Sequence, residues 1–108
     1  MAFEELEKNR MKAYISKVSI EYIQETIKKN NLKKVLEIGT CYGYSALKLS
    51  TVAQSVTTIE KDHESVEIAG KNFKKYKKDN IKIIEGMAIP ILKQLQKKGE
   101  KFDLILID

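Results

Sequence analysis

The sequence predicts an α/β fold in which helices flank a parallel β-sheet. Four short apolar or β-branched runs alternate with longer segments of helical periodicity, as is typical of β-α-β units with right-handed crossovers. Residues 35–47 combine a buried strand, a turn containing glycines and the start of a helix. That order of elements is found at nucleotide-type cofactor sites. We therefore expect one small α/β domain organised around this turn.

Composition supports a globular protein and excludes several other classes. Of the 108 residues, 43% are hydrophobic and 32% are charged, which argues against intrinsic disorder. No apolar run is long enough to cross a membrane, and the first five residues lack the plan of a signal peptide. Cys41 is the single cysteine, so we expect no internal disulfide, no structural zinc site and a reducing, cytoplasmic setting.

The net charge of +5 permits anionic partners such as RNA or a CoA-linked substrate. Arg10 is the only arginine, whereas dedicated nucleic-acid surfaces usually use more of this residue because its planar fork grips phosphate. The lysines between residues 71 and 78 are therefore interpreted mainly as a solvated helix face. We expect the only histidine, His63, to lie on the surface.

An N-terminal helical segment is expected over residues 1–31. Residues 4–12 are highly charged and predict a short helix. A second helix follows, for which Ser16 or Ser19 can serve as the N-cap, with apolar residues at helical spacing: Ile20, Ile23 and Ile27. The cations and asparagines at 28–31 suit its C-terminus.

Residues 32–108 are predicted to form the cofactor-binding β/α half of the domain. The strands are expected at 34–38, 55–60, 81–85 and 102–108, with helices at 45–53, from Asp62 to the turn at 79–80, and from about Pro90 to Lys98, where Gly99 is the C-terminal cap. The fourth strand is so apolar that it should be interior and paired on both edges. We therefore expect either a fragment of a longer protein or another chain that completes the sheet.

The turn after the first strand carries the most specific chemical pattern. Gly39 and Gly43 let the backbone approach a ligand, and the helix that follows offers free amides and the Ser45 hydroxyl to an anion. The pattern is not Gly-x-Gly-x-x-Gly, and Glu37 at the strand tip would repel a pyrophosphate. An acid there suits an ammonium or sulfonium charge, both of which S-adenosylmethionine (SAM) carries. Glu37 and the missing third glycine disfavour a nicotinamide cofactor.

Three further positions follow strands two, three and four. Glu60 ends strand two about twenty residues after the turn, where an acid can bind both ribose hydroxyls. The loop after strand three contains Met87 and Ala88, whose backbone can hydrogen-bond an adenine while Met87 packs on it. Asp108 ends strand four beside strand one, where it can ligate a divalent cation or hold the cofactor ammonium.

With these motifs, the sequence resembles the class I, cation-dependent O-methyltransferases, the group that includes catechol and caffeoyl-CoA O-methyltransferases. The resemblance is carried by Leu36–Thr40 with Gly43–Ala46, by Glu85–Pro90 and by Phe102–Asp108. It spans about residues 14–108 and covers only the N-terminal half or so of the family's domain. It implies a Rossmann-like methyltransferase fold, apparently truncated after strand four, with N-terminal helices and the sheet order 3-2-1-4.

The resemblance also implies roles for individual residues. Those at the methionine end of SAM would be Glu37, Gly39, Thr40 and Ser45; Glu60 would hold the ribose and Ala88 would face the adenine, while Ile15 and Ser16 would close over the cofactor. Asp108 stands where the family has its first ligand for Mg²⁺ or another divalent cation. The lysine that follows this aspartate shortly afterwards in the family, and the Asp-Asn pair that completes the metal site, would lie beyond Asp108.

The resulting hypothesis is SAM-dependent methyl transfer to a hydroxyl of a small phenolic, catechol-like or CoA-linked acceptor, assisted by a divalent cation. One alternative is a tRNA methyltransferase that acts on a wobble-uridine hydroxyl. Another is a non-catalytic, truncated or split cofactor-binding module that needs a partner chain. A homodimer or a partner chain that pairs with the fourth strand is expected, and no membrane partner.

Overall fold

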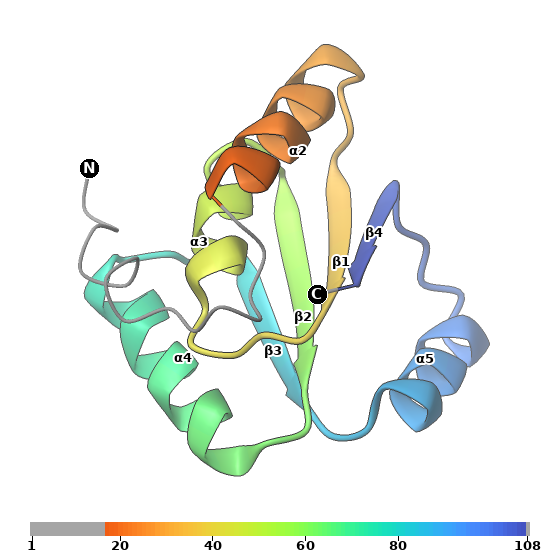
Figure 1. The fold of residues 1–108 in the computed structure, drawn as a ribbon. Helices are drawn as coiled ribbons and strands as arrows, with labels where there is room; N and C mark the ends of the chain where they lie inside the picture. The colour runs from red at the N-terminus through yellow and green to blue at the C-terminus, as the bar shows by residue number, and fades with distance from the viewer. Residues whose placement is uncertain (1–16, 108) are drawn as a thin grey trace.

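The computed structural model describes residues 17–107, which form a single parallel sheet with helices on both faces (Figure 1). In chain order the elements are α2 (Lys17–Lys29), β1 (Lys34–Ile38), α3 (Tyr44–Ser50), β2 (Ser55–Glu60), α4 (His63–Lys75), β3 (Ile81–Glu85), α5 (Ala88–Lys97) and β4 (Leu104–Ile107). The strands lie in the order β3-β2-β1-β4. The predicted fold class and strand order are therefore confirmed.

Two apolar clusters, one on each face of the sheet, hold the layers together. On one face α2, α3 and α4 pack against Val35 and Val56, and residues such as Ile20, Leu47 and Phe73 are almost fully buried there. On the other face α5 packs against Leu36 and Ile59 through Ile91 and Leu95. Figure 1 shows α5 on the opposite side of the sheet from the other three helices. Strands covered on both faces explain the continuous apolar runs in the sequence.

The ends of several helices follow the predicted local chemistry. The Asp62 carboxylate accepts from the Ser65 amide and caps α4. Gly99 has φ +76°, and the Glu100 amide bonds the Leu95 carbonyl just after α5, which is the hydrogen-bond pattern of a Schellman cap. Helix α2 begins at Lys17, so Ser19 lies inside it and is not its cap.

Helix α3 ends at Ser50, three residues earlier than predicted. Beyond it the backbone winds more tightly, since Thr51 and Val52 donate to carbonyls only three residues back. The side chain of Asn80, the residue directly before β3, donates to the carbonyls of Ser50 and Ala53 at 3.0 and 3.3 Å. These long-range bonds satisfy carbonyls that a continued helix would otherwise have used.

Strand β4 pairs with β1, and its far edge has no partner strand among the described residues. Ile105 and Ile107 are 55% and 75% exposed. Ile105 shares its face with Leu36, against which α5 packs, and it lines an open hollow together with Leu95 of α5. The expectation of a fully covered fourth strand is therefore not met within residues 17–107.

Candidate functional site

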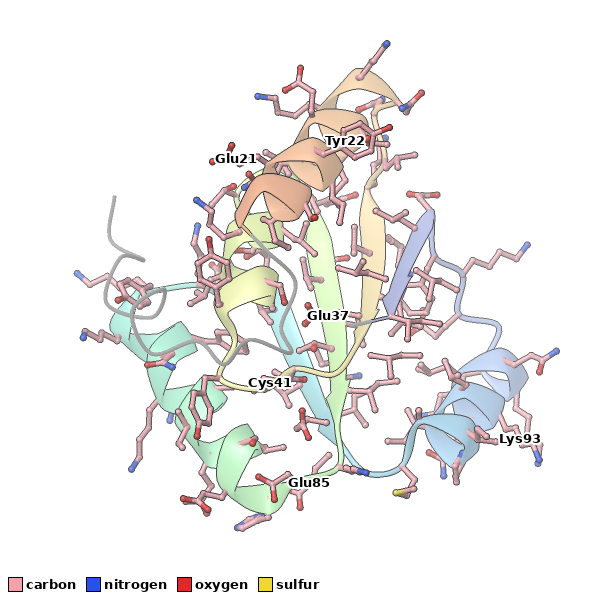
Figure 2. The ribbon with its side chains drawn as sticks, viewed as in Figure 1. Glu21, Tyr22, Glu37, Cys41, Glu85 and Lys93 are labelled. Carbon is pink, nitrogen blue, oxygen red and sulfur yellow. The ribbon has the colours of Figure 1, made fainter. Side chains whose placement is uncertain are left out.

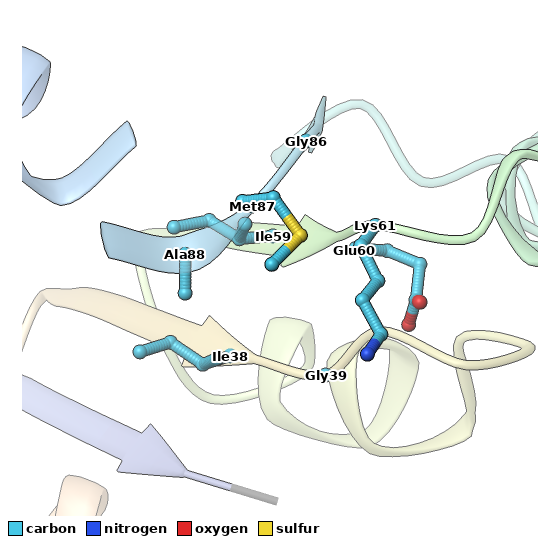
Figure 3. A pocket seen from close by; sticks show the side chains of 8 residues that line it. All are labelled: Ile38, Gly39, Ile59, Glu60, Lys61, Gly86, Met87 and Ala88. Atoms are coloured by element: carbon cyan, nitrogen blue, oxygen red, sulfur yellow. The ribbon is translucent and has the colours of Figure 1, made fainter. Parts of the chain in front are cut away.

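A pocket of about 280 Å³ lies at the carboxyl ends of three neighbouring strands (Figure 3). Its lining comes from the end of β1, the end of β2 with the residue that follows, and the loop between β3 and α5: Ile38, Gly39, Ile59, Glu60, Lys61, Gly86, Met87 and Ala88. In open parallel sheets, ligands bind outside the carboxyl ends of the strands. The position and size of the pocket suit one moiety of a nucleotide-like molecule.

The turn from β1 to α3 borders this pocket and has an unusual backbone. Gly39, Cys41 and Gly43 have φ angles of +101°, +53° and +93°. An added Cβ on Gly43 would lie 2.6 Å from the Phe73 ring, which belongs to α4. Gly43 is therefore required both by its backbone angle and by the close approach of α4. At Gly39, which lines the pocket, the absence of a side chain lets the backbone come close to a ligand.

Glu60 stands at the rim of the pocket with its carboxylate already oriented. Its Oε1 accepts from the Cys41 amide at 2.8 Å, and its Oε2 accepts from the Asp62 amide at 3.0 Å. Two oxygens offer about four acceptor positions in all. The remaining positions can accept two hydroxyl groups of a bound ligand, such as the vicinal pair of a ribose.

Glu37 lies deeper and has no solvent-exposed surface. Figure 2 shows it in the interior beside the sheet, with Cys41 on the turn. Its Oε2 accepts from the Ser45 hydroxyl, and its Oε1 accepts from the Thr58 hydroxyl at 2.7 Å. Thr40 is also buried and hydrogen-bonds Thr58 at 2.6 Å. Hydrogen-bond donors of this kind lower the cost of burying a carboxylate.

The structure therefore divides the residues predicted for the cofactor site into two groups. The first, Gly39, Glu60 and Ala88, lines the pocket together with Met87. The second, Glu37, Thr40 and Ser45, is buried behind the turn and is absent from the pocket lining. Ile15, Ser16 and Asp108 lie outside the described residues, so their predicted roles stay predictions.

Sequence reasoning overlooked Lys61 and Thr58. Lys61 lines the pocket beside Glu60, and its position directly after the acid at the tip of β2 was the available signal. Thr58 was read only as a β-branched strand residue. Its position beside Glu37 could have been found by aligning the carboxyl ends of β1 and β2, because Thr58 and Glu37 lie opposite each other in the register of these strands.

His63 lies beside the loop that supplies Gly86 and Met87. It is exposed, as predicted, but its Nδ1 is 3.0 Å from Glu85 Oε1 and its Nε2 is 2.8 Å from Glu67 Oε1. The hydrogen bond to Glu85 and the negative charges of Glu85 and Glu67 raise the pKa of His63 above its usual value. The first turn of α4 is thereby tied to the end of β3.

Comparison with known proteins assigns this architecture to a family. The family model described as "O-methyltransferase" matches residues 2–108. The chain belongs to this O-methyltransferase family. An O-methyltransferase from Bacillus cereus, solved in complex with S-adenosylhomocysteine (SAH), is 27% identical with a TM-score of 0.81, the match covering 95% of this chain and 49% of that one. The SAH-bound methyltransferase PaMTH1 from Podospora anserina is 30% identical with a TM-score of 0.82, and the coverages are 96% and 47%.

Three further observations concern the extent of the chain, metal ligands and membrane-spanning helices. The chain spans about half the length of the solved structures it matches. Between Lys17 and Ile107, no group of three or more His, Cys, Asp and Glu side chains could hold a metal ion. Nor does that stretch contain a helix with the length and apolar character needed to span a membrane.

Proposed function

We propose that the chain forms the SAM-binding half of an O-methyltransferase. The observation that carries the proposal is the convergence of Gly39, Glu60 and Ala88 on one pocket. In this proposal Glu60 accepts hydrogen bonds from the ribose hydroxyls, and the loop at Met87 and Ala88 contacts the adenine. The glycine turn receives the methionine end, with Glu37, Thr40 and Ser45 supporting it from beneath. Ile15, in the preceding segment, is proposed to close over the cofactor.

The pocket fits the chemistry of this cofactor in two respects. Its lining is mainly apolar, with one carboxylate held at the rim by two backbone amides, which suits an aromatic base attached to a diol. The turn beside it begins at Gly39, which lines the pocket without a side chain, so the backbone there stays open. When bound, SAM supplies an activated methyl group, and the residues named above bind and orient it.

We propose that the methyl acceptor is a hydroxyl of a small phenolic, catechol-like or CoA-linked molecule, with assistance from Mg²⁺ or another divalent cation. The family assignment supports an oxygen acceptor. In the cation proposal, Asp108 would supply one carboxylate ligand. The tRNA alternative has no observation in its favour on residues 17–107. A cytoplasmic location is proposed because the chain has only one cysteine, Cys41.

Calorimetry tests the cofactor assignment. We expect the chain to bind SAH and to bind NAD⁺ far more weakly. Replacing Glu60 by Gln should weaken SAH binding about 10- to 100-fold, because a charge-assisted hydrogen bond contributes about 1.5–3 kcal/mol. Glu64→Gln makes the same chemical change at an exposed position outside the pocket and serves as the control. Equal affinities for SAH in all three proteins would remove Glu60 from the site.

Because the matched structures are about twice as long, we expect this chain to bind cofactor without catalysing transfer. A radiometric assay with SAM, Mg²⁺ and catechol should detect no methylated product. Clear turnover by the 108-residue chain would show that the part described is already sufficient, contrary to the proposal.

We also propose that a second copy or another chain pairs with β4. The supporting observation is the exposure of Ile105 and Ile107 beside a partly apolar hollow that Phe102 and Leu95 also line. Exposed apolar edge strands are templates for pairing with another strand. Light scattering on the purified chain should give a mass above 12.4 kDa, whereas a monomer at all concentrations would contradict self-pairing.

A further inference from the structure

The hydroxyl of Thr58 lies at the centre of a buried row of polar side chains beneath the glycine turn. It donates to Glu37 Oε1 at 2.7 Å and lies 2.6 Å from Thr40 Oγ1. Because a threonine hydroxyl has one proton, and that proton is directed to Glu37, Thr40 must donate to Thr58. Ser45 donates to the other oxygen of Glu37. In this row Thr40 therefore donates to Thr58, and Thr58 donates to Glu37. Ser45, from α3, is the second donor to Glu37.

Strand register explains why this arrangement is well defined. Glu37 and Thr58 are direct neighbours across β1 and β2, and neither has exposed surface. Val35 and Val56, two residues earlier on each strand, are buried on the same face under α3. A β-branched side chain has few rotamers. The hydroxyl of Thr58 is thus fixed by its own strand, and it in turn fixes the carboxylate.

Thr58 and Glu60 together hold the turn from one face of β2. Because Thr58 and Glu60 are two residues apart on β2, their side chains project from the same face of the strand. Glu60 accepts from the Cys41 amide in the turn, and Thr58 holds Thr40, the residue before Cys41. Within the turn Cys41 has φ +53° although it is not a glycine, a backbone conformation that persists only where surrounding contacts hold it.

We propose that Thr58 is a positioning residue for the cofactor site, acting through Thr40 and Glu37. It does not line the pocket. Its hydroxyl sets the place of the Glu37 carboxylate and the shape of the turn that receives the methionine end of the cofactor. This inference rests on the proposed function, in which the pocket binds SAM.

Loss of the hydroxyl removes one donor from a carboxylate that water does not reach. Glu37 then shifts toward its remaining partners, and Thr40 loses its acceptor. Both changes act on the turn, and the shift also moves a negative charge relative to the cofactor. SAM carries a sulfonium charge that SAH lacks, so the affinity for SAM falls more than the affinity for SAH.

Three variants separate this role from a general loss of stability. Thr58→Val replaces the hydroxyl by a methyl group, and Thr58→Ser keeps it. Thr57→Val also replaces a hydroxyl by a methyl group, but on the opposite face of β2. The Thr57 hydroxyl does not belong to the row of hydrogen bonds that joins Thr40, Thr58 and Glu37. We expect Thr58→Val to weaken SAM binding about tenfold or more and SAH binding by a smaller factor, with the other two variants within about threefold of wild type. Thr58→Ala takes the place of Thr58→Val if that variant does not fold.

Hydrogen exchange gives a readout that needs no ligand. The Cys41 amide donates to the Glu60 carboxylate and the Gly43 amide donates to the Thr40 carbonyl. We expect both amides to exchange about tenfold faster in Thr58→Val only. Unchanged exchange, unchanged SAM affinity, equal losses for SAM and SAH, or an equal defect in Thr58→Ser would each overturn the positioning role. If wild type binds neither SAM nor SAH, the proposed function fails, and exchange alone decides the role of Thr58.

Discussion

Gly43→Ala should destabilise the fold strongly for a substitution that adds one methyl group. Gly43 has φ +93°, and a Cβ there would lie 2.6 and 3.0 Å from two carbons of the Phe73 ring and 3.4 Å from Ala69 Cβ. The backbone angle costs about 1–2 kcal/mol for a residue with a side chain. Forcing a methyl group into a packed interface costs about 1–3 kcal/mol more. We therefore expect the free energy of unfolding to fall by about 2–5 kcal/mol.

Urea unfolding followed by circular dichroism measures this loss. Gly70→Ala is the matched control, because Gly70 lies inside α4 and an added Cβ meets no atom within 4 Å. That variant should gain about 0.5–1 kcal/mol from the higher helix propensity of alanine. Phe73→Leu removes ring atoms, so Gly43→Ala should cost less in that background. A loss below about 1 kcal/mol for Gly43→Ala, or an equal loss for Gly70→Ala, would refute the steric and conformational reasoning.

Two further predictions concern pH. The hydrogen bond to Glu85 raises the pKa of His63 in the folded chain above its usual value of 6.5, so its stabilising contribution is complete below the unfolded pKa and is lost as pH rises through the folded pKa. The unfolding free energy of wild type minus that of His63→Gln should therefore fall between about pH 5 and pH 9, and a constant difference would contradict the ion pair. The backbone amides of Lys34 and Lys33 lower the pKa of Asp103 below 3.8, so its contribution is present above the unfolded pKa and is lost as pH falls through the folded pKa. Acid titration of wild type beside Asp103→Asn should show that loss in wild type only.

The sequence allowed the strands to be predicted closely because each is a short apolar run bounded by turn residues. β1, β2 and β3 have the predicted bounds. The end of α3 was predicted wrongly because the carbonyl of its last residue, Ser50, accepts from the Asn80 side chain thirty residues away. Helix propensity depends on neighbouring residues in the sequence, so it cannot predict a hydrogen bond to a distant residue.

At the candidate site, sequence predicted the residues at the strand tips but not the layer beneath them. Gly39, Glu60 and Ala88 follow from the rule that ligands bind at the carboxyl ends of parallel strands. The burial of Glu37 and the part played by Thr58 depend on strand register. Register follows from the whole packed sheet, so the sequence alone did not show that the Glu37 carboxylate is buried and hydrogen-bonded to Thr58 and Ser45.

The most direct test of the cofactor site is an NMR titration of the isotopically labelled chain with SAH. We expect the amide signals of Gly39, Lys61, Gly86 and Ala88 to shift together, since these residues line one pocket. Signals from the exposed side of α2, such as Tyr22, should stay in place. Shifts confined to other surfaces, or the same shifts with NAD⁺ at a lower concentration, would contradict a SAM site at the ends of β1, β2 and β3.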